Sequence, residues 1–263
     1  MEKVMNTSQD MHEHFSKVAA AYNDIRTTDV EPILSIKDTL NGLPRINAAD
    51  IGCGAGRYCL KLFQYLDNLH LTCIDFNEAM LEVTSGCLQA AGITNFRTIK
   101  SLAESVPLAD NSMDCIFSFN AIHHFDFVRF MEKMSRVLKS GGRIFIYTRL
   151  RSQNARNIWG RHFPLFLEKE NRLHELHEIE EMLKLIPPLV VESVKRFRYW
   201  RNSTLSRLVN QARNGHYSTF SLYRRDEFEA ALQAFCDNII DNFSSSEKVG
   251  WFDENVLLVV RKT

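Results

Sequence analysis

The chain has 263 residues, of which 45% are hydrophobic and 24% charged, and its 32 basic and 32 acidic side chains cancel. This composition is typical of a folded globular protein and excludes a disordered chain. No apolar run reaches the roughly 18 residues that cross a bilayer, and residues 1–28 contain no signal-peptide core. We therefore expect a cytoplasmic protein with no membrane segment. The six cysteines lack zinc-like spacing, so we expect small core residues and no metal site.

The N-terminal part predicts an amphipathic helix, because apolar residues recur there at helical spacing from Phe15 to Tyr22. We expect residues 1–40 to form lid helices over the carboxyl edge of a sheet. Residues 41–150 then form the first part of an α/β core. Residues 151–263 supply the rest of the core and a helical cap, mainly at 151–173 and 199–224.

Short β-branched or aromatic runs then alternate with helical patterns of about a dozen residues, which predicts a mostly parallel sheet with helices on both faces. One of these helices begins at an N-cap, Asp126, and is expected to stop at Gly141 and Gly142. The expected strands cover residues 46–51, 69–75, 96–99, 114–119 and 143–148.

After Arg149 two segments could each supply the last helix and strand of the core. One helical stripe at 176–186 precedes an apolar run at 189–197, and another at 228–236 precedes a run at 255–261. The pattern favours the first segment for the core.

A glycine-rich turn follows the first predicted strand and opens a helix. Gly52, Gly54 and Gly56 let the backbone turn sharply and approach a ligand. A dinucleotide fingerprint has its third glycine one residue later, at the position of Arg57. Asp50, two residues before the first glycine, would repel a pyrophosphate but suits a ligand with a cationic amino group.

The second predicted strand ends in an acid about 20 residues past the glycines. There Asp75 can accept hydrogen bonds from both hydroxyls of a ribose, with Phe76 and Met80 as neighbours of an adenine. The alternative is that Asp75 only caps the helix that begins at Glu78.

Six short sequences resemble the class I S-adenosylmethionine (SAM) dependent methyltransferases, in the group related to ubiquinone/menaquinone-biosynthesis methyltransferases. The resemblance covers roughly residues 15–150, and it implies a Rossmann-like seven-stranded fold with SAM as cofactor. Its carriers are ADIGCGAG at 49–56, CIDFN at 73–77, AESVPL at 103–108, SMD at 112–114, AIHH at 121–124 and VLKSGGR at 137–143.

The resemblance also implies which residues contact SAM. Gly52 and Gly54 would lie at its methionine part, Asp75 at the ribose, and Ala103 with Glu104 at the adenine edge; Cys53 is also expected to contact the cofactor. The family often has an aspartate just before this pair, where the chain has Leu102. Two further residues are expected near the methionine moiety and its carboxylate, namely Asn120 and Arg26.

Methyl transfer from a sulfonium is an in-line displacement, so the enzyme mainly aligns the nucleophile and excludes water. Residues near the ends of the fourth and fifth strands are candidates for catalysis, namely His123, His124 and Tyr147. Residues of the lid and the cap are candidates for contact with the acceptor, namely Tyr22, Arg149, Arg201, His216 and Tyr217.

Two basic stretches bear on the acceptor. Residues 133–167 and 193–225 each hold eight lysines and arginines and no acid. Such charges repel unless the fold brings acids near or an anion binds. We expect a small, anionic acceptor. The alternatives are a tRNA methyltransferase of the wobble-uridine type, or a non-catalytic SAM-binding regulatory protein.

Overall fold

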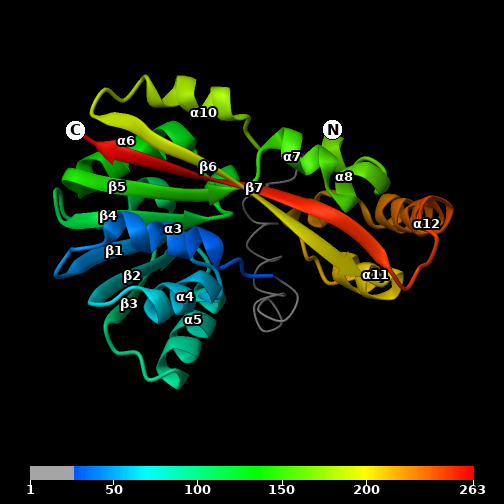
Figure 1. Cartoon of the computed structure of the whole chain (residues 1–263), viewed down its shortest axis with the longest axis horizontal. Helices are drawn as coiled ribbons and strands as arrows, with labels where there is room; N and C mark the ends of the chain where they lie inside the picture. Colours follow the sequence, from blue (N-terminus) through cyan, green and yellow to red (C-terminus); the bar gives the residue numbers. More distant parts are fainter. Residues whose placement is uncertain (1–26) are drawn as a thin grey trace, which may run out of the picture. The chain divides into compact units, whose positions relative to one another are not determined.

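The structure is a computed structural model that describes residues 27–263, with a seven-stranded sheet in the order β3-β2-β1-β4-β5-β7-β6 (Figure 1). The expected helix around Phe15 and two expected site residues, Tyr22 and Arg26, lie outside the described residues. The strands are β1 (Ile46–Ile51), β2 (Leu69–Asp75), β3 (Phe96–Lys100), β4 (Met113–Phe119), β5 (Leu138–Thr148), β6 (Leu189–Ser203) and β7 (Val249–Lys262).

The first five strands run parallel, and the direction of their connections explains why helices cover both faces. From β1 the chain steps to β2 and β3 on one side, while β4 and β5 lie on the other side of β1. Because crossovers between parallel strands are right-handed, connections that step in opposite directions put their helices on opposite faces. The helices of this part are α3 (Glu31–Leu40), α4 (Arg57–Tyr65), α5 (Glu78–Ala90), α6 (Phe127–Val137) and α10 (Leu176–Leu183).

The structure corrects one predicted boundary. Helix α6 is capped by Asp126 as expected, but it ends at Val137 and not at the glycine pair. Strand β5 begins directly afterwards, since Leu138 already pairs with Met113 of β4. The register then shifts, and residues 139–142 form an irregularity within the strand pair. The two glycines therefore belong to this irregularity inside β5 and not to the helix end.

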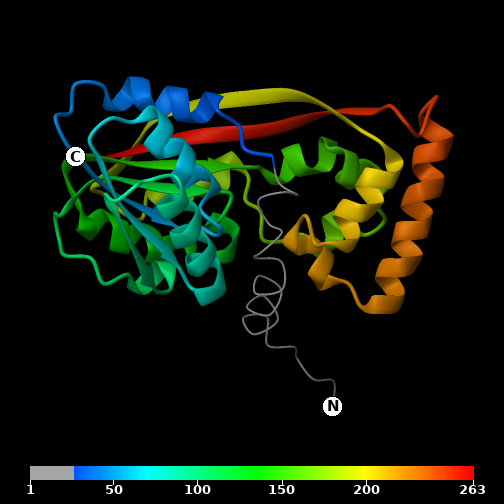
Figure 2. The ribbon, with the colours of Figure 1, turned by 90° about the horizontal axis from the view of Figure 1, so that it is seen from below.

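Both C-terminal segments contribute a strand to the sheet. β7 lies antiparallel to β5, and β6 is the outermost strand on that side. They are also the longest strands, with 14 and 15 residues (Figure 2). Helix α10 packs on α6, in agreement with the favoured segment. The expectation that one segment alone would complete the core is therefore wrong for the strands.

The described chain divides into two compact units. The first contains residues 27–148, 174–195 and 256–263, and the second contains residues 149–173 and 196–255. No helix in residues 27–263 is both long and apolar enough to cross a membrane. The elements of the second unit, apart from parts of β6 and β7, are α7 (Arg151–Arg156), α8 (Ile158–His162), α9 (Phe166–Lys169), α11 (Leu205–Arg213), η4 (Ser218–Leu222) and α12 (Arg225–Asn242).

Aromatic side chains form the core of the second unit. The Trp159 ring stacks on Phe235 with 5.0 Å between centroids, and Phe163 meets Phe220 edge to face at 5.1 Å. Trp159, Phe163 and Phe235 are each at most 3% exposed. Such buried aromatic rings stabilise a small core through their large apolar area and their ring geometry.

Candidate functional site

Four predicted site residues lie at or just beyond the carboxyl ends of neighbouring parallel strands in the first unit. Gly52 follows β1, Asp75 ends β2, Asn120 follows β4 and Tyr147 lies near the end of β5. These strands are β2-β1-β4-β5 in order, so their carboxyl ends share one edge of the sheet. Ligands of open α/β sheets bind at such edges.

The glycine turn adopts backbone angles that other residues rarely take. Gly52, Gly54 and Gly56 have φ values of +72°, +55° and +76°. Gly52 is also crowded, because a Cβ atom there would lie 2.6 Å from the Cβ of Ala121 and 3.0 Å from the ring of Phe125. The absence of a side chain at Gly52 therefore lets the segment after β4 close over the turn.

Asp75 joins the glycine turn to the segment after β2. Its Oδ2 accepts a hydrogen bond from the backbone N–H of Gly54 (2.9 Å), and its Oδ1 accepts one from Asn77 (2.9 Å). Burial raises the pKa of Asp75, and these backbone donors oppose the shift. The helix cap is a different residue, since the Asn77 side chain accepts from the N–H of Met80. The reading of Asp75 as only a helix cap is therefore wrong.

Asp50 is a second buried carboxylate, and it lies in a poorer environment. It is 1% exposed, and its Oδ2 accepts a weak hydrogen bond from the Cys59 thiol at 3.2 Å. Among the described residues its Oδ1 has no hydrogen-bond partner. Burial raises the pKa of the Asp50 carboxyl well above its usual range, and the Cys73 thiol adds to this shift. A cationic group would relieve the cost of this carboxylate.

The residues expected around an adenine lie near the same edge. Met80 is 1% exposed and Phe76 half-buried. Ala103 and Glu104 form the short 3-10 helix η2 (Ala103–Ser105), and Glu104 accepts a hydrogen bond from the N–H of Asp126 at 2.7 Å. Glu104 thus ties η2 to the start of α6.

The segment after β4 holds three further candidates. Asn120 adopts a left-handed conformation with φ +54°, and its N–H donates to the carbonyl oxygen of Tyr147 at 2.7 Å. His123 and His124 belong to the 3-10 helix η3 (Ile122–His124), where their rings lie 4.1 Å apart. Both are half-buried. The strained Asn120 marks the sharp turn out of β4, which is typical of a functional edge.

Tyr147 has a partner that the sequence analysis missed. Its buried hydroxyl donates a hydrogen bond to Oδ2 of Asp29 at 2.7 Å. Arg57 holds the same segment, because its guanidinium donates to Thr27 O at 2.7 Å and to Thr28 Oγ1 at 2.9 Å. Residues 27–29 are thus anchored at the carboxyl edge. No local pattern around Asp29 could have indicated this contact.

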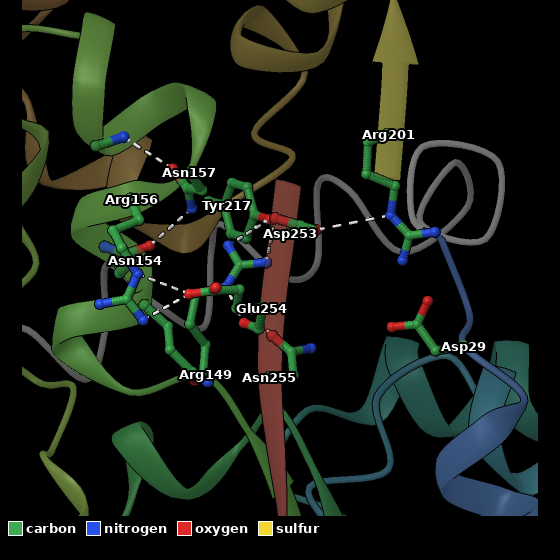
Figure 3. Close-up of polar contacts among 12 residues, drawn as sticks. Asp29, Arg149, Asn154, Arg156, Asn157, Arg201, Tyr217, Asp253, Glu254 and Asn255 are labelled. Atoms are coloured by element: carbon green, nitrogen blue, oxygen red, sulfur yellow. Dashed lines mark hydrogen bonds and ion pairs between the residues drawn. The ribbon is translucent and has the colours of Figure 1, made fainter. Parts of the chain in front are cut away.

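In the second unit, Arg149 is the centre of a polar network (Figure 3). Its guanidinium donates to Asp253 Oδ1 at 2.7 Å and to the Tyr217 hydroxyl at 2.9 Å. Its Nε donates to Asn255 Oδ1 at 3.3 Å and to the carbonyl of Glu254 at 3.4 Å. With this many acceptors, Arg149 joins β7 to Tyr217 within the unit.

The other predicted acceptor residues of this unit lie around the same network. Arg201 lies 3.9 Å from Asp253, and its guanidinium packs 4.6 Å from the centre of the Tyr199 ring. The His216 ring meets Tyr217 edge to face at 4.6 Å. Of the residues predicted to contact the methyl acceptor, all those that the structure describes therefore lie close together.

The fold supplies acids to the basic stretches. Asp253 pairs with Arg149 and Arg201, while Glu254 pairs with two more arginines, Arg156 at 2.7 Å and Arg198 at 3.7 Å. Sequence reasoning missed both acids, although they adjoin the predicted last strand. Among these six side chains, four arginines share two carboxylates. In residues 27–263 no group of three or more His, Cys, Asp or Glu side chains is placed to hold a metal ion.

Comparisons with known proteins agree with this geometry. Residues 49–146 match the sequence model of a methyltransferase domain. The uncharacterized methyltransferase YcgJ of Bacillus subtilis (strain 168) is 35% identical over 136 residues, which are 50% of this chain and 52% of that protein. The ubiquinone/menaquinone biosynthesis C-methyltransferase UbiE of Vibrio cholerae is 30% identical over 55% of this chain and 57% of its own. The chain thus spans about half the length of these curated relatives.

Solved structures extend the likeness of fold to most of the chain. The crystal structure of YcgJ from Bacillus subtilis has a TM-score of 0.61 and 18% identity, covering 89% of this chain and 99% of that one. A geranyl diphosphate methyltransferase in complex with SAM has a TM-score of 0.57 and 15% identity, over 89% of this chain and 85% of its own. The chain therefore has the Rossmann-like fold of these methyltransferases, as expected.

The packing around the glycine turn predicts a difference between two glycines. Gly56→Ala is expected to lower the free energy of unfolding by about 1–3 kcal/mol more than Gly92→Ala. Both positions have positive φ (+76° and +72°), but only at Gly56 would the new Cβ meet a neighbour, Thr84 at 2.9 Å. Urea denaturation of both variants measures the difference. Equal losses of unfolding free energy in the two variants would show that backbone strain alone determines both, without a contribution from the contact with Thr84.

Proposed function

We propose that this chain, whose residues 49–146 are a methyltransferase domain, is a SAM-dependent methyltransferase that acts on a small acceptor. One observation carries the proposal. A turn of three glycines with positive φ is tied at Gly54 to Asp75 of the next strand, and it begins two residues after the buried carboxylate of Asp50 in β1. These three features, namely the glycine turn, Asp75 and Asp50, suit a ligand that combines a nucleoside with an amino acid.

The groups at this edge fit the parts of SAM. The Asp50 oxygen without a partner suits an ammonium group, which would offset the cost of the buried carboxylate. The two Asp75 oxygens accept backbone hydrogen bonds from Gly54, Phe76 and Asn77, and a carboxylate has about four acceptor sites, which leaves room for a ribose hydroxyl. Phe76 is half-buried and offers apolar surface to an adenine, whereas Met80 is buried and its contact with the adenine stays a prediction. SAM would supply the methyl group on a sulfonium.

The chain's own residues would bind and orient the cofactor and the acceptor, and they would exclude water. His123 and His124 stay candidates for taking a proton from the acceptor, because both are half-buried beyond β4. The Tyr147 hydroxyl donates its hydrogen bond to Asp29, so toward the methyl acceptor its oxygen would accept a hydrogen bond. These roles, and the contacts of Cys53, Ala103, Glu104 and Asn120 with SAM, stay predictions.

The anionic acceptor is the finer part of the proposal. Four arginines share Asp253 and Glu254 in the second unit, so this group keeps an excess of positive charge. Arginine binds carboxylates and phosphates with paired hydrogen bonds. The ion pairs also agree with the simpler interpretation that the fold brings acids near these arginines. Arg149 already donates hydrogen bonds to several groups of the protein. Arg201, whose ion pair with Asp253 (3.9 Å) is longer than that of Arg149 (2.7 Å), is therefore the better test.

The proposed function predicts selective stabilisation by S-adenosylhomocysteine (SAH), the demethylated product of SAM. SAM or SAH at about a hundredfold above the dissociation constant contributes roughly 2.7 kcal/mol through linkage. For a chain of this length the melting temperature should rise by about 5–10 °C. Thermal unfolding with SAM, SAH and NAD measures this. Stabilisation by NAD and by neither SAM species would contradict the proposal.

Asp75→Ala is expected to weaken SAH binding by about 1.5–3 kcal/mol, or roughly 10- to 150-fold. The substitution removes the acceptor for the ribose and the tie to Gly54. Asn77→Ala is the matched control, since it removes the cap of α5 but leaves the Asp75 carboxylate in place. Calorimetry on both folded variants measures the affinities. A loss as large in the control would mean that the segment between β2 and α5, and not the Asp75 carboxylate, determines the affinity.

The anionic acceptor predicts a charge-dependent effect of Arg201→Gln. In a screen of acidic and neutral acceptors, its KM for acidic acceptors should rise roughly tenfold, the loss of one hydrogen bond between charged groups. Arg213→Gln is the control, because Arg213 pairs with Glu229 on an exposed helix surface. Release of SAH measures turnover. The anionic acceptor would be rejected if both variants turned over neutral acceptors equally and turned over no acidic acceptor.

A further inference from the structure

Three cysteine thiols lie together at the glycine turn and the elements next to it. Cys53 is part of the turn, Cys59 lies in the first turn of α4 and Cys73 lies in β2. The Sγ atoms of Cys59 and Cys73 are 3.5 Å apart, and Cys59 donates its thiol hydrogen to Asp50. All three are free thiols. A chain of thiol contacts therefore ends on the carboxylate that the proposed function assigns to the ammonium of SAM.

The thiols differ in exposure and in acidity. Cys59 and Cys73 are fully buried, whereas Cys53 is half-buried and is the member nearest to solvent. The contacts with the Cys53 and Cys59 thiols lower the pKa of Cys73, which favours its thiolate. The thiolate is the form that reacts with peroxides and sulfenic acids. Cys115, by contrast, is a buried cysteine in β4 for which burial raises the pKa.

We propose that Cys59 and Cys73 are a site of reversible oxidation, and that their disulfide lowers the affinity of the adjacent glycine turn for its cofactor. The effect on the cofactor rests on the proposed function, whereas the modification site rests on the thiol geometry alone. A disulfide bond is about 2.05 Å long, so the two sulfurs need to approach by about 1.5 Å.

The reaction needs a peroxide as oxidant and balances with hydrogen peroxide. One thiolate attacks the peroxide, gaining a hydroxyl as sulfenic acid, while the other peroxide oxygen leaves as water with the thiol proton. The second thiol then attacks the sulfenic sulfur; the S–S bond forms and hydroxide leaves as water with the second proton. In total, two thiols and one hydrogen peroxide give one disulfide and two waters. A dithiol such as dithiothreitol reverses it by exchange.

The disulfide would act on the site through Asp50 and through the backbone. Cys59 could no longer donate to Asp50, so the pKa of this carboxyl would rise further and the negative charge that attracts an ammonium would be lost. The bond would also pull the start of α4 against β2, and the glycine turn connects to that end of α4. Packed protein interiors have low compressibility and transmit strain, so the glycine turn would move as well.

The experiment compares the full chain before and after treatment with a modest excess of hydrogen peroxide. Peptide mapping without reductant should find the Cys59–Cys73 disulfide. Calorimetry should find SAH affinity lowered about tenfold, the loss of one hydrogen bond to a charged group, and restored by dithiothreitol. Cys59→Ser keeps a hydroxyl donor for Asp50 but cannot form the bond, so it should bind SAH and resist peroxide. Cys115→Ser keeps both thiols and should stay sensitive.

Several results would overturn the inference. These are an oxidised protein without the Cys59–Cys73 peptide, an unchanged affinity despite that disulfide, and a Cys59→Ser protein that loses affinity equally on oxidation. If Cys59→Ser fails to fold, Cys73→Ala serves the same purpose. A reduced protein that binds no SAH while the disulfide still forms would contradict the proposed function and the effect on binding, but it would support the modification site.

Discussion

The arrangement of the candidate site depends on the hydrogen bonds of one buried carboxylate. Asp75 accepts from Gly54 and from Asn77, so the turn after β1 and the segment after β2 are held by a side chain where the sheet itself has ended. Burial raises the pKa of Asp75 and disfavours its charge, and the backbone donors oppose part of this shift. A carboxylate fixed in this way needs no rearrangement to accept further hydrogen bonds, which is what a preorganised binding site requires.

The neighbouring carboxylate has the opposite character. Asp50 is equally buried, but its hydrogen bond from Cys59 is weak and one oxygen has no partner in the described chain. An incompletely satisfied buried charge lowers stability, so the protein retains an unfavourable group at the position where the proposed ligand carries its ammonium. The same contact connects Asp50 to the thiol cluster, and in this way cofactor binding and thiol chemistry share one set of atoms.

In the second unit, charge is balanced by sharing. Asp253 and Glu254 are adjacent residues of β7, and each pairs with two arginines from elsewhere in the unit. Arg149 also donates to Tyr217, so the network holds β7 to the residues before η4. Its centre is buried, and buried ion pairs with satisfied hydrogen bonds specify one arrangement more than they add stability. We infer that this network keeps the unit's arginines in defined positions.

The sequence by itself determined the parallel strands β1 to β4, the glycine turn and the place of Asp75, because periodicity, glycine spacing and strand ends are local properties. It also identified the residues that gather around Arg149 in the second unit. Only the tertiary structure decided that two C-terminal strands complete the sheet, that residues 139–142 lie inside β5, and that Asp29 and Asp253 are partners of Tyr147 and Arg149. These pairs are 118 and 104 residues apart in the chain, and no local pattern encodes a contact that arises only when distant segments are brought together.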